Sequence, residues 1–201
     1  MSNVVAFVSL SLDGVMQAPA RPDEDRRGGF EHGGWALAYA SLGAGMDQTG
    51  NTGAMLLGRR TYEDLYSVWP NRTDGNPFTP LLNNTQKYVA STTLQEPLPW
   101  MNSTLLTGDA VEAVAKLKEN LDHDLLILGS RELVQSLMRR NLVDKFVLLI
   151  HPLVLGSGRR LFADDGPYTT LALANVSTTP TGVVVATYQR AESPAIEITD
   201  A

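Results

Sequence analysis

The chain has 201 residues and contains no cysteine. The absence of thiols excludes disulfide bonds, thiolate metal ligands and a cysteine nucleophile. Histidine is scarce as well: His32, His123 and His151 are far apart, and none belongs to an HExxH-type motif. Because catalytic zinc sites are built from closely spaced ligands of this kind, we expect no metal in the functional site.

The sequence also lacks a net positive charge and long apolar runs. The 16 Lys and Arg residues are outnumbered by 22 Asp and Glu residues, which gives a net charge of -6. Such a chain has no overall positive field to hold nucleic acid or an anionic membrane. The segment MSNVVAFVSLSLDG has no basic start, and its apolar run is too short for a signal peptide or a membrane span. We therefore expect a cytoplasmic protein that binds neither nucleic acid nor membranes.

No internal repeat and no linker divides the sequence. Its hydrophobic share of 43% and charged share of 19% are typical of a globular protein. We expect one domain over residues 1–190 and a flexible tail over 191–201. Residues 17–34 are rich in glycine, proline and charge, which indicates a long loop, and loops of that length are often functional.

Apolar runs typical of strands alternate with amphipathic segments typical of helices. Strands are expected at residues 3–11, 53–58, 87–91, 103–107, 124–128, 144–151, 169–178 and 183–190. Helices are expected at residues 35–46, 59–68, 110–121 and 131–140, with Asp109 as an N-cap. The alternation predicts an α/β fold of three layers, α/β/α, with a mainly parallel central sheet. The last two strands predict an antiparallel hairpin at the C-terminus.

Two strand-to-helix junctions stand out, Gly-Arg-Arg-Thr at 58–61 and Gly-Ser-Arg at 129–131. The free N–H groups at a helix start attract phosphate, and arginines beside them add positive charge. In open α/β sheets ligands bind outside the carboxyl ends of the strands, where both junctions would lie. The alternatives are a surface helix start with solvated arginines at 58–61 and an ordinary turn with Ser130 as N-cap. No GxGxxG follows the first strand, so the Rossmann fingerprint is absent.

A third candidate is Asp13, which follows the first strand and precedes Gly14. A carboxylate at this place could hydrogen-bond a ligand or supply a proton, although an Asp-Gly turn is the simpler interpretation. The glycine-rich segment 152–158, with Leu155 and Gly156 at its centre, could shape a substrate pocket or bind an anion. It could equally be a flexible connection. Glu31, in the long loop, is kept as a reserve acid.

Together these motifs resemble a known family. The order SLDG, LLGRRTYE, KYVAS, LGS, LVDKF and LVLGSGRRLF, from Val4 to Phe162, is similar to the dihydrofolate-reductase-like superfamily. It is most similar to the C-terminal reductase domain of the bifunctional riboflavin-biosynthesis deaminase–reductase. The deaminase half and its zinc signature are missing from this chain. The resemblance implies a dihydrofolate-reductase-like fold, NADPH bound across the strand ends, and a homodimer.

The resemblance also implies site residues. Those for the cofactor are Gly58, Arg59, Arg60, Thr61, Ser91, Thr92, Gly129, Ser130, Arg131, Leu133 and Val134. Within this set Ser91 and Thr92 match the region of the adenosine 2′-phosphate, and the arginines favour NADPH over NADH. Those for the substrate are Asp13, Gly14, Leu155 and Gly156, with Asp13 also the candidate catalytic residue.

The expected activity is therefore that of an NADPH-dependent reductase in riboflavin biosynthesis. Such an enzyme transfers a hydride to the ribosylamino carbon of a phosphorylated aminopyrimidine, 5-amino-6-(5-phosphoribosylamino)uracil. Two alternatives stay open from the sequence. One is an NADPH-dependent reductase for an unrelated carbonyl, imine or pterin substrate. The other is a nucleotide-binding protein without turnover.

Overall fold

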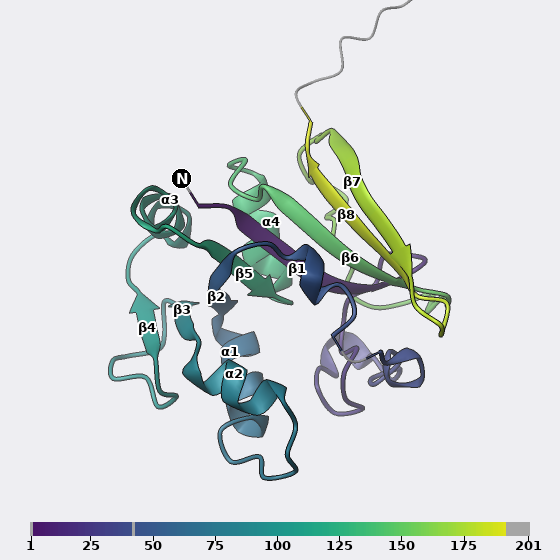
Figure 1. The fold of residues 1–201 in the computed structure, drawn as a ribbon, viewed down its shortest axis with the longest axis horizontal. Helices are drawn as coiled ribbons and strands as arrows, with labels where there is room; N and C mark the ends of the chain where they lie inside the picture. Colours follow the sequence, from purple (N-terminus) through teal and green to yellow (C-terminus); the bar gives the residue numbers. More distant parts are fainter. Residues whose placement is uncertain (1, 42, 192–201) are drawn as a thin grey trace, which may run out of the picture.

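A computed structural model describes residues 2–41 and 43–191, and all of its named strands belong to one sheet of eight (Figure 1). The strands are β1 (Val4–Ser11), β2 (Thr52–Gly58), β3 (Gln86–Ala90), β4 (Ser103–Leu106), β5 (Asp124–Leu128), β6 (Lys145–His151), β7 (Leu171–Thr178) and β8 (Val184–Arg190). Their order across the sheet is β4-β3-β2-β5-β1-β6-β8-β7. The six strands from β4 to β6 run parallel, and β8 and β7 continue the sheet antiparallel. The expected mainly parallel sheet with a C-terminal hairpin is thus confirmed.

In the described part of the chain, four α-helices lie between the strands. They are α1 (Arg59–Val68), α2 (Phe78–Asn84), α3 (Ala110–Asn120) and α4 (Arg131–Met138). The helix α3 begins where predicted, because the Asp109 carboxylate accepts the backbone N–H of Val111 at 2.7 Å and of Glu112 at 3.1 Å. Residues Leu133 and Val134 on α4 face the core, as the apolar spacing of this helix requires.

The core has two sides because successive strand residues point to opposite faces of the sheet. On one face, Val4, Ala6 and Ile127 pack against α3 and α4. On the opposite face, strand residues of β2 and β3 pack against α1 and α2 around Tyr62 and Trp100. This arrangement is the three-layer α/β/α architecture, and it places the carboxyl ends of the parallel strands at one edge of the sheet.

Two expectations about helices were wrong. The described residues 35–41 and 43–46 form no α-helix and contain the short 3-10 turn Leu37–Tyr39, with a second turn beginning at Met46. Gly43 and Gly45 have φ of +76° and +75°, so the chain turns where a helix would continue. The short helix α2 was missed, since its sequence FTPLLNN shows no helical periodicity of useful length. Of the expected tail, residues 192–201 lie outside the described residues. Across residues 2–41 and 43–191, no helix has the length and apolar character needed to span a membrane.

Candidate functional site

The two strand-to-helix junctions are joined by a hydrogen bond. Strands β2 and β5 are neighbours in the sheet, and the backbone N–H of Gly58 donates to the Ser130 hydroxyl oxygen at 2.9 Å. Ser130 occupies the N-cap position of α4 with φ of +55°, but its side chain makes no capping hydrogen bond to this helix. The residue links the starts of α1 and α4, which makes the two junctions a single structural unit.

A cavity of about 560 Å³ lies over these junctions; we call it the junction cavity. It brings together nine of the eleven residues expected to bind the cofactor, namely Gly58, Arg59, Arg60, Thr61, Ser91, Thr92, Ser130, Arg131 and Leu133. Of the remaining two, Gly129 lines the neighbouring cavity. Val134 is fully buried in the core and lines neither cavity.

Positive charge predominates in the junction cavity. Five arginines line it, at positions 27, 59, 60, 131 and 159, against two acids, Asp109 and Glu132. Arg59 pairs with Glu63 one turn along α1 at 3.1 Å, and Arg60 lies 3.9 Å from Glu132. Such exposed pairs are weak and exchange readily, so these arginines are available to an anion.

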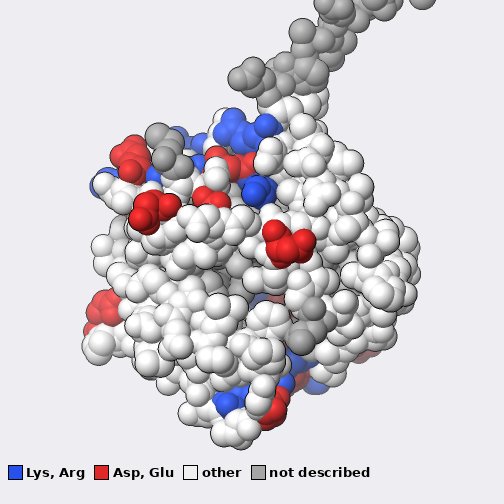
Figure 2. Space-filling view, viewed as in Figure 1, with Lys and Arg blue, Asp and Glu red and all other residues white. Residues whose placement is uncertain are grey.

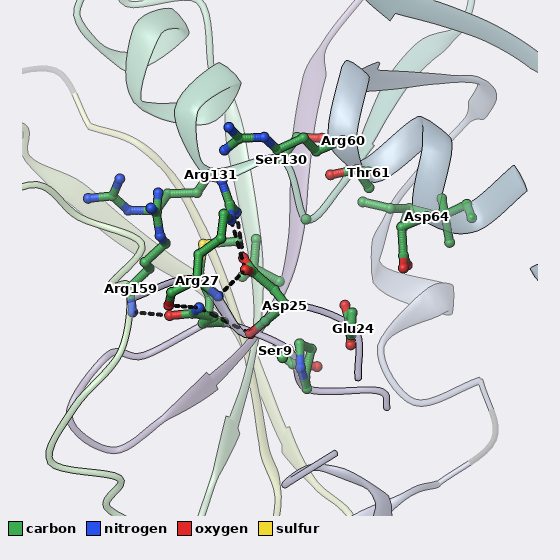
Figure 3. Close-up of a pocket in the computed structure, with 18 of the residues that line it drawn as sticks. Ser9, Glu24, Asp25, Arg27, Arg60, Thr61, Asp64, Ser130, Arg131 and Arg159 are labelled. Atoms are coloured by element: carbon green, nitrogen blue, oxygen red, sulfur yellow. Dashed lines mark hydrogen bonds and ion pairs between the residues drawn. The ribbon is translucent and has the colours of Figure 1, made fainter. Parts of the chain in front are cut away.

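A second cavity, of about 570 Å³, lies between the end of β1, residues 16–27 of the long loop, and α1 (Figure 3). We call it the loop cavity. It shares six lining residues with the junction cavity, namely Arg27, Arg60, Thr61, Ser130, Arg131 and Arg159. The two cavities therefore adjoin along the carboxyl ends of the strands, and a ligand longer than either could occupy both.

Arg27 has unused hydrogen-bonding capacity in the loop cavity. Its Nε donates to the Asp25 carboxylate at 2.7 Å, and this contact raises the pKa of the guanidinium. Burial acts to raise the pKa of Asp25, but the hydrogen bonds and charge of Arg27 outweigh it and the pKa lies below its usual value. In the described part of the chain, the buried Arg27 Nη1 has no hydrogen-bond partner. Because an unpaired buried donor is costly, this atom suits an acceptor on a ligand.

The long loop is fixed over this cavity by buried Gln17. Its Nε2 donates to the carbonyl oxygen of Arg27 at 2.9 Å, and its Oε1 accepts the backbone N–H of Arg159 at 3.0 Å. Arg21 also holds the loop, because its guanidinium makes a bidentate ion pair with Asp64 on α1. The loop is therefore held to two separate parts of the fold.

Glu24 and Asp64 lie on the opposite side of the loop cavity from Arg27 and Arg159, whereas Asp25 lies beside Arg27 (Figure 3). Asp64 is paired with Arg21, as described above. Glu24 accepts the backbone N–H of Ala20 at 2.8 Å and of Arg21 at 3.2 Å, both through Oε2. Burial raises the pKa of Glu24, and the nearby Asp64 charge raises it further.

The structure does not bring Asp13 into either cavity. Its carboxylate accepts the Ser11 hydroxyl at 2.7 Å and the backbone N–H groups of Leu155 and Gly156 at 3.1 and 3.0 Å. The Ser11 hydrogen bond is the largest of the effects that lower the pKa of Asp13. Asp13 thus ties the turn that contains Gly14 to the segment that follows β6, and this geometry favours the simple turn interpretation over proton supply.

Sequence reasoning missed the part of the site that the long loop contributes. Gln17, Glu24 and Arg27 lie in a segment whose charge and length were noted, but no periodicity assigns partners to loop residues. Asp64 lies within the helix α1, and in the sequence nothing distinguishes it from an ordinary acidic residue on a helix surface. Among the described residues, no three His, Asp or Glu side chains lie where they could hold a metal ion.

Comparison with known proteins defines first a class and then a family. The structure is similar to a dihydrofolate reductase from Enterococcus faecalis complexed with NADP(H), with a TM-score of 0.60, 12% identity and coverage of 94% of this chain and 97% of that one. The fold is therefore dihydrofolate-reductase-like. The RibD C-terminal domain family matches residues 2–185, and the chain belongs to this family.

Two further relatives agree with this membership. A putative riboflavin biosynthesis protein from Shewanella sp. PV-4 has a TM-score of 0.69 and 23% identity, with coverage of 96% of this chain and 100% of that one. The uncharacterized protein YyaP of Bacillus subtilis is 28% identical over 189 residues, which are 92% of this chain and 93% of its own length. The chain thus spans nearly the full length of both relatives.

Proposed function

We propose that the protein is an NADPH-dependent reductase of the riboflavin-biosynthesis type. The observation that carries this proposal is the arginine-rich junction cavity, in which one hydrogen bond between Gly58 and Ser130 unites two helix starts. A dinucleotide needs donors for a diphosphate and, in NADPH, for one further phosphate. The donor set of this chain fits that requirement, with arginines, hydroxyl groups and backbone N–H groups facing one space.

Each part of the cavity has a proposed partner on the cofactor. Residues 129–131 hold the diphosphate at the start of α4, while Thr61 adds a hydroxyl from α1. Arg59 faces the same cavity as Ser91 and Thr92, at the end of β3, and this group holds the 2′-phosphate. When bound, NADPH supplies the hydride. The contribution of the chain is to bind and orient the reactants and to exclude water.

The loop cavity is the proposed substrate site. It adjoins the junction cavity, and its unpartnered Arg27 Nη1 and neighbouring Arg159 suit the phosphate of a phosphorylated aminopyrimidine. In the proposed reaction the ribose ring first opens: the bond from the ribosylamino carbon to the ring oxygen breaks, a proton moves from the exocyclic nitrogen to that oxygen, and an imine forms. The imine carbon then gains a hydride, the π electron pair moves to the nitrogen, and the nitrogen takes a proton. We assign Asp13 no part in this proton transfer, because its carboxylate lies outside both cavities and is already engaged.

Absorbance at 340 nm tests this function. The protein, NADPH and 5-amino-6-(5-phosphoribosylamino)uracil are mixed, and the ribityl product is quantified by mass spectrometry. We expect one NADPH consumed per ribityl product and much slower turnover with NADH. The alternative is a nucleotide-binding protein without turnover. It would be supported if NADPH binds saturably but is not oxidised in the presence of this substrate or of a panel of carbonyl, imine and pterin compounds.

A homodimer is also proposed, as the family resemblance implies. Strand β7 is an edge of the sheet and is almost wholly exposed, and residues 167–189 contain no charged side chain. Figure 2 shows the hairpin side of this face nearly free of Lys, Arg, Asp and Glu. Uncharged exposed edges are prone to pair with another strand. Light scattering after gel filtration should give twice the chain mass, and Val176→Lys should shift the protein to monomer.

A further inference from the structure

Reduction of a polar double bond needs a proton as well as a hydride, and few groups of the loop cavity can provide one. The cavity has no histidine, lysine or tyrosine in its lining. Its arginines stay protonated at all accessible pH values and cannot donate. The remaining ionisable groups are four carboxyls, Glu24, Asp25, Glu63 and Asp64.

Three of these four carboxyls are each paired with an arginine. Asp25 pairs with Arg27, Glu63 with Arg59 and Asp64 with Arg21. Each of these three carboxylates is therefore already engaged by a positive charge. Within the described residues, Glu24 makes no ion pair.

The geometry of Glu24 leaves one oxygen available. Both backbone N–H groups that reach its carboxyl, from Ala20 and Arg21, are accepted by Oε2. In the described part of the structure no donor reaches Oε1. Figure 3 shows the Glu24 side chain on the same side of the cavity as Asp64, across from Arg27 and Arg159. The phosphate-binding and proton-carrying sides of the cavity are therefore separate.

The surroundings of Glu24 favour its protonated form. Burial raises its pKa first, and the charge of Asp64 adds to this, while the two backbone N–H groups and the charge of Arg21 act in the opposite direction. The other charged groups that line the cavity are Asp25, Arg26, Arg27, Arg60, Glu63, Arg131 and Arg159. Among the described residues, all of these except Arg26 and Arg131 make ion pairs with neighbouring side chains.

We propose that Glu24 is the proton donor of this site, with Asp64 and Arg21 as positioning residues. The proton on the Glu24 carboxyl passes to the nitrogen or oxygen bonded to the carbon that receives the hydride. The π electron pair of the substrate becomes the new bond to that proton, Glu24 is left as a carboxylate, and solvent reprotonates it after product leaves. The inference rests on the proposed function and adds the acceptor class, an imine or carbonyl carbon with a basic neighbouring atom.

The test compares three substitutions in the full chain. Glu24→Gln removes the acidic proton while its amide oxygen still accepts both backbone hydrogen bonds, so the loop is expected to stay folded. Asp64→Asn removes the neighbouring negative charge. Glu31→Gln is the matched control, because Glu31 is an exposed glutamate of the same loop outside both cavities.

The measured quantities are kcat, the KM for NADPH and the pH profile of kcat/KM, with 5-amino-6-(5-phosphoribosylamino)uracil as substrate. For Glu24→Gln we expect kcat to fall by about 10²-fold or more, the usual contribution of a general acid, with little change in the KM for NADPH. The wild-type profile should decline on its alkaline side above the usual pKa of glutamate. In Asp64→Asn that decline should move to lower pH, because both the lost charge and the unpaired Arg21 lower the pKa of Glu24.

Different failures lead to different conclusions. If the turnover of Glu24→Gln stays within twofold of wild type, the role of Glu24 is overturned and the proposed function is not. The same holds if Asp64→Asn leaves the alkaline decline of kcat/KM in place. A wild-type protein that reduces neither this substrate nor a carbonyl or imine panel overturns the proposed function and the proton donor with it. A carbon-13 NMR titration of labelled glutamate, assigned with the Glu24→Gln variant, adds a readout without turnover. A midpoint at or below the usual glutamate value contradicts the proposal.

Discussion

The selectivity of the junction cavity for NADPH can be tested with the single substitution Arg59→Ala. Arg59 lines this cavity together with Ser91 and Thr92, and its side chain is 38% exposed. Removal of the side chain should weaken the binding of NADPH, which carries the 2′-phosphate, and leave the binding of NADH almost unchanged.

The size of the effect follows from what Arg59 contacts in the free protein. A hydrogen bond to a charged group contributes about 1.5–3 kcal/mol. Arg59 must first leave Glu63, one turn along α1 at 3.1 Å, and an exposed pair of this kind is worth about 0.3–0.5 kcal/mol. Partial exposure reduces the gain further. We therefore expect the Kd for NADPH to rise by about tenfold, equivalent to about 1.4 kcal/mol.

Quenching of tryptophan fluorescence provides the assay, with isothermal titration calorimetry as a check. The Kd values for NADPH and NADH are measured for wild type, Arg59→Ala and the control Glu63→Gln. The control variant frees Arg59 from its partner and should lower the Kd for NADPH slightly. Equal weakening of both cofactors by Arg59→Ala would refute the assignment of the 2′-phosphate to this side of the cavity.

Three further predictions concern stability and pH. Ser130→Ala leaves the Gly58 N–H without its acceptor. The free energy of unfolding should therefore fall by about 1 kcal/mol and Tm by about 2–4 °C in scanning fluorimetry, and NADPH binding should weaken. An unchanged Tm contradicts the link between the junctions. Asp13→Asn should retain turnover within twofold yet be less stable to urea than wild type. Because the folded-state pKa of Asp13 lies below 3.8, this difference is present above pH 3.8 and disappears on acidification through the folded pKa. Burial lowers the pKa of Lys87 from 10.5 to about 8, so between these pH values the unfolded chain holds more protons than the folded one. The stability of wild type relative to Lys87→Met should therefore rise from pH 8 to pH 10.5. A stability difference that does not change with pH counts against the burial of this amine.

The parts of the fold that sequence reasoning predicted are those governed by local periodicity. The strand β5 and the helix α1 have the predicted bounds, since apolar alternation and the Gly58 break are properties of neighbouring residues. The helix expected at residues 35–46 was wrong for a tertiary reason. A Cβ on Gly45 would lie 2.9 Å from Val185 of β8, so packing against the sheet dictates a tight turn there.

The site divides in the same way. The junction residues could be proposed from the sequence because a glycine at a strand end followed by arginine is a local pattern, and the structure brings most of them to one cavity. The partner of Ser130 was not, because Gly58 is 72 residues away in the chain. Glu24 and Asp64 come close only after Arg21 ties the loop to α1, and no local pattern encodes that contact. For Asp13 the motif suggested chemistry, whereas the carboxylate accepts hydrogen bonds that hold a turn outside both cavities.

The most direct test of the account is a crystal structure of the protein soaked with NADPH. The account predicts the diphosphate at residues 129–131, the 2′-phosphate between Arg59 and the end of β3, and the nicotinamide directed toward the loop cavity. A dinucleotide bound elsewhere, or no saturable uptake of NADPH by crystals and solution alike, would contradict it.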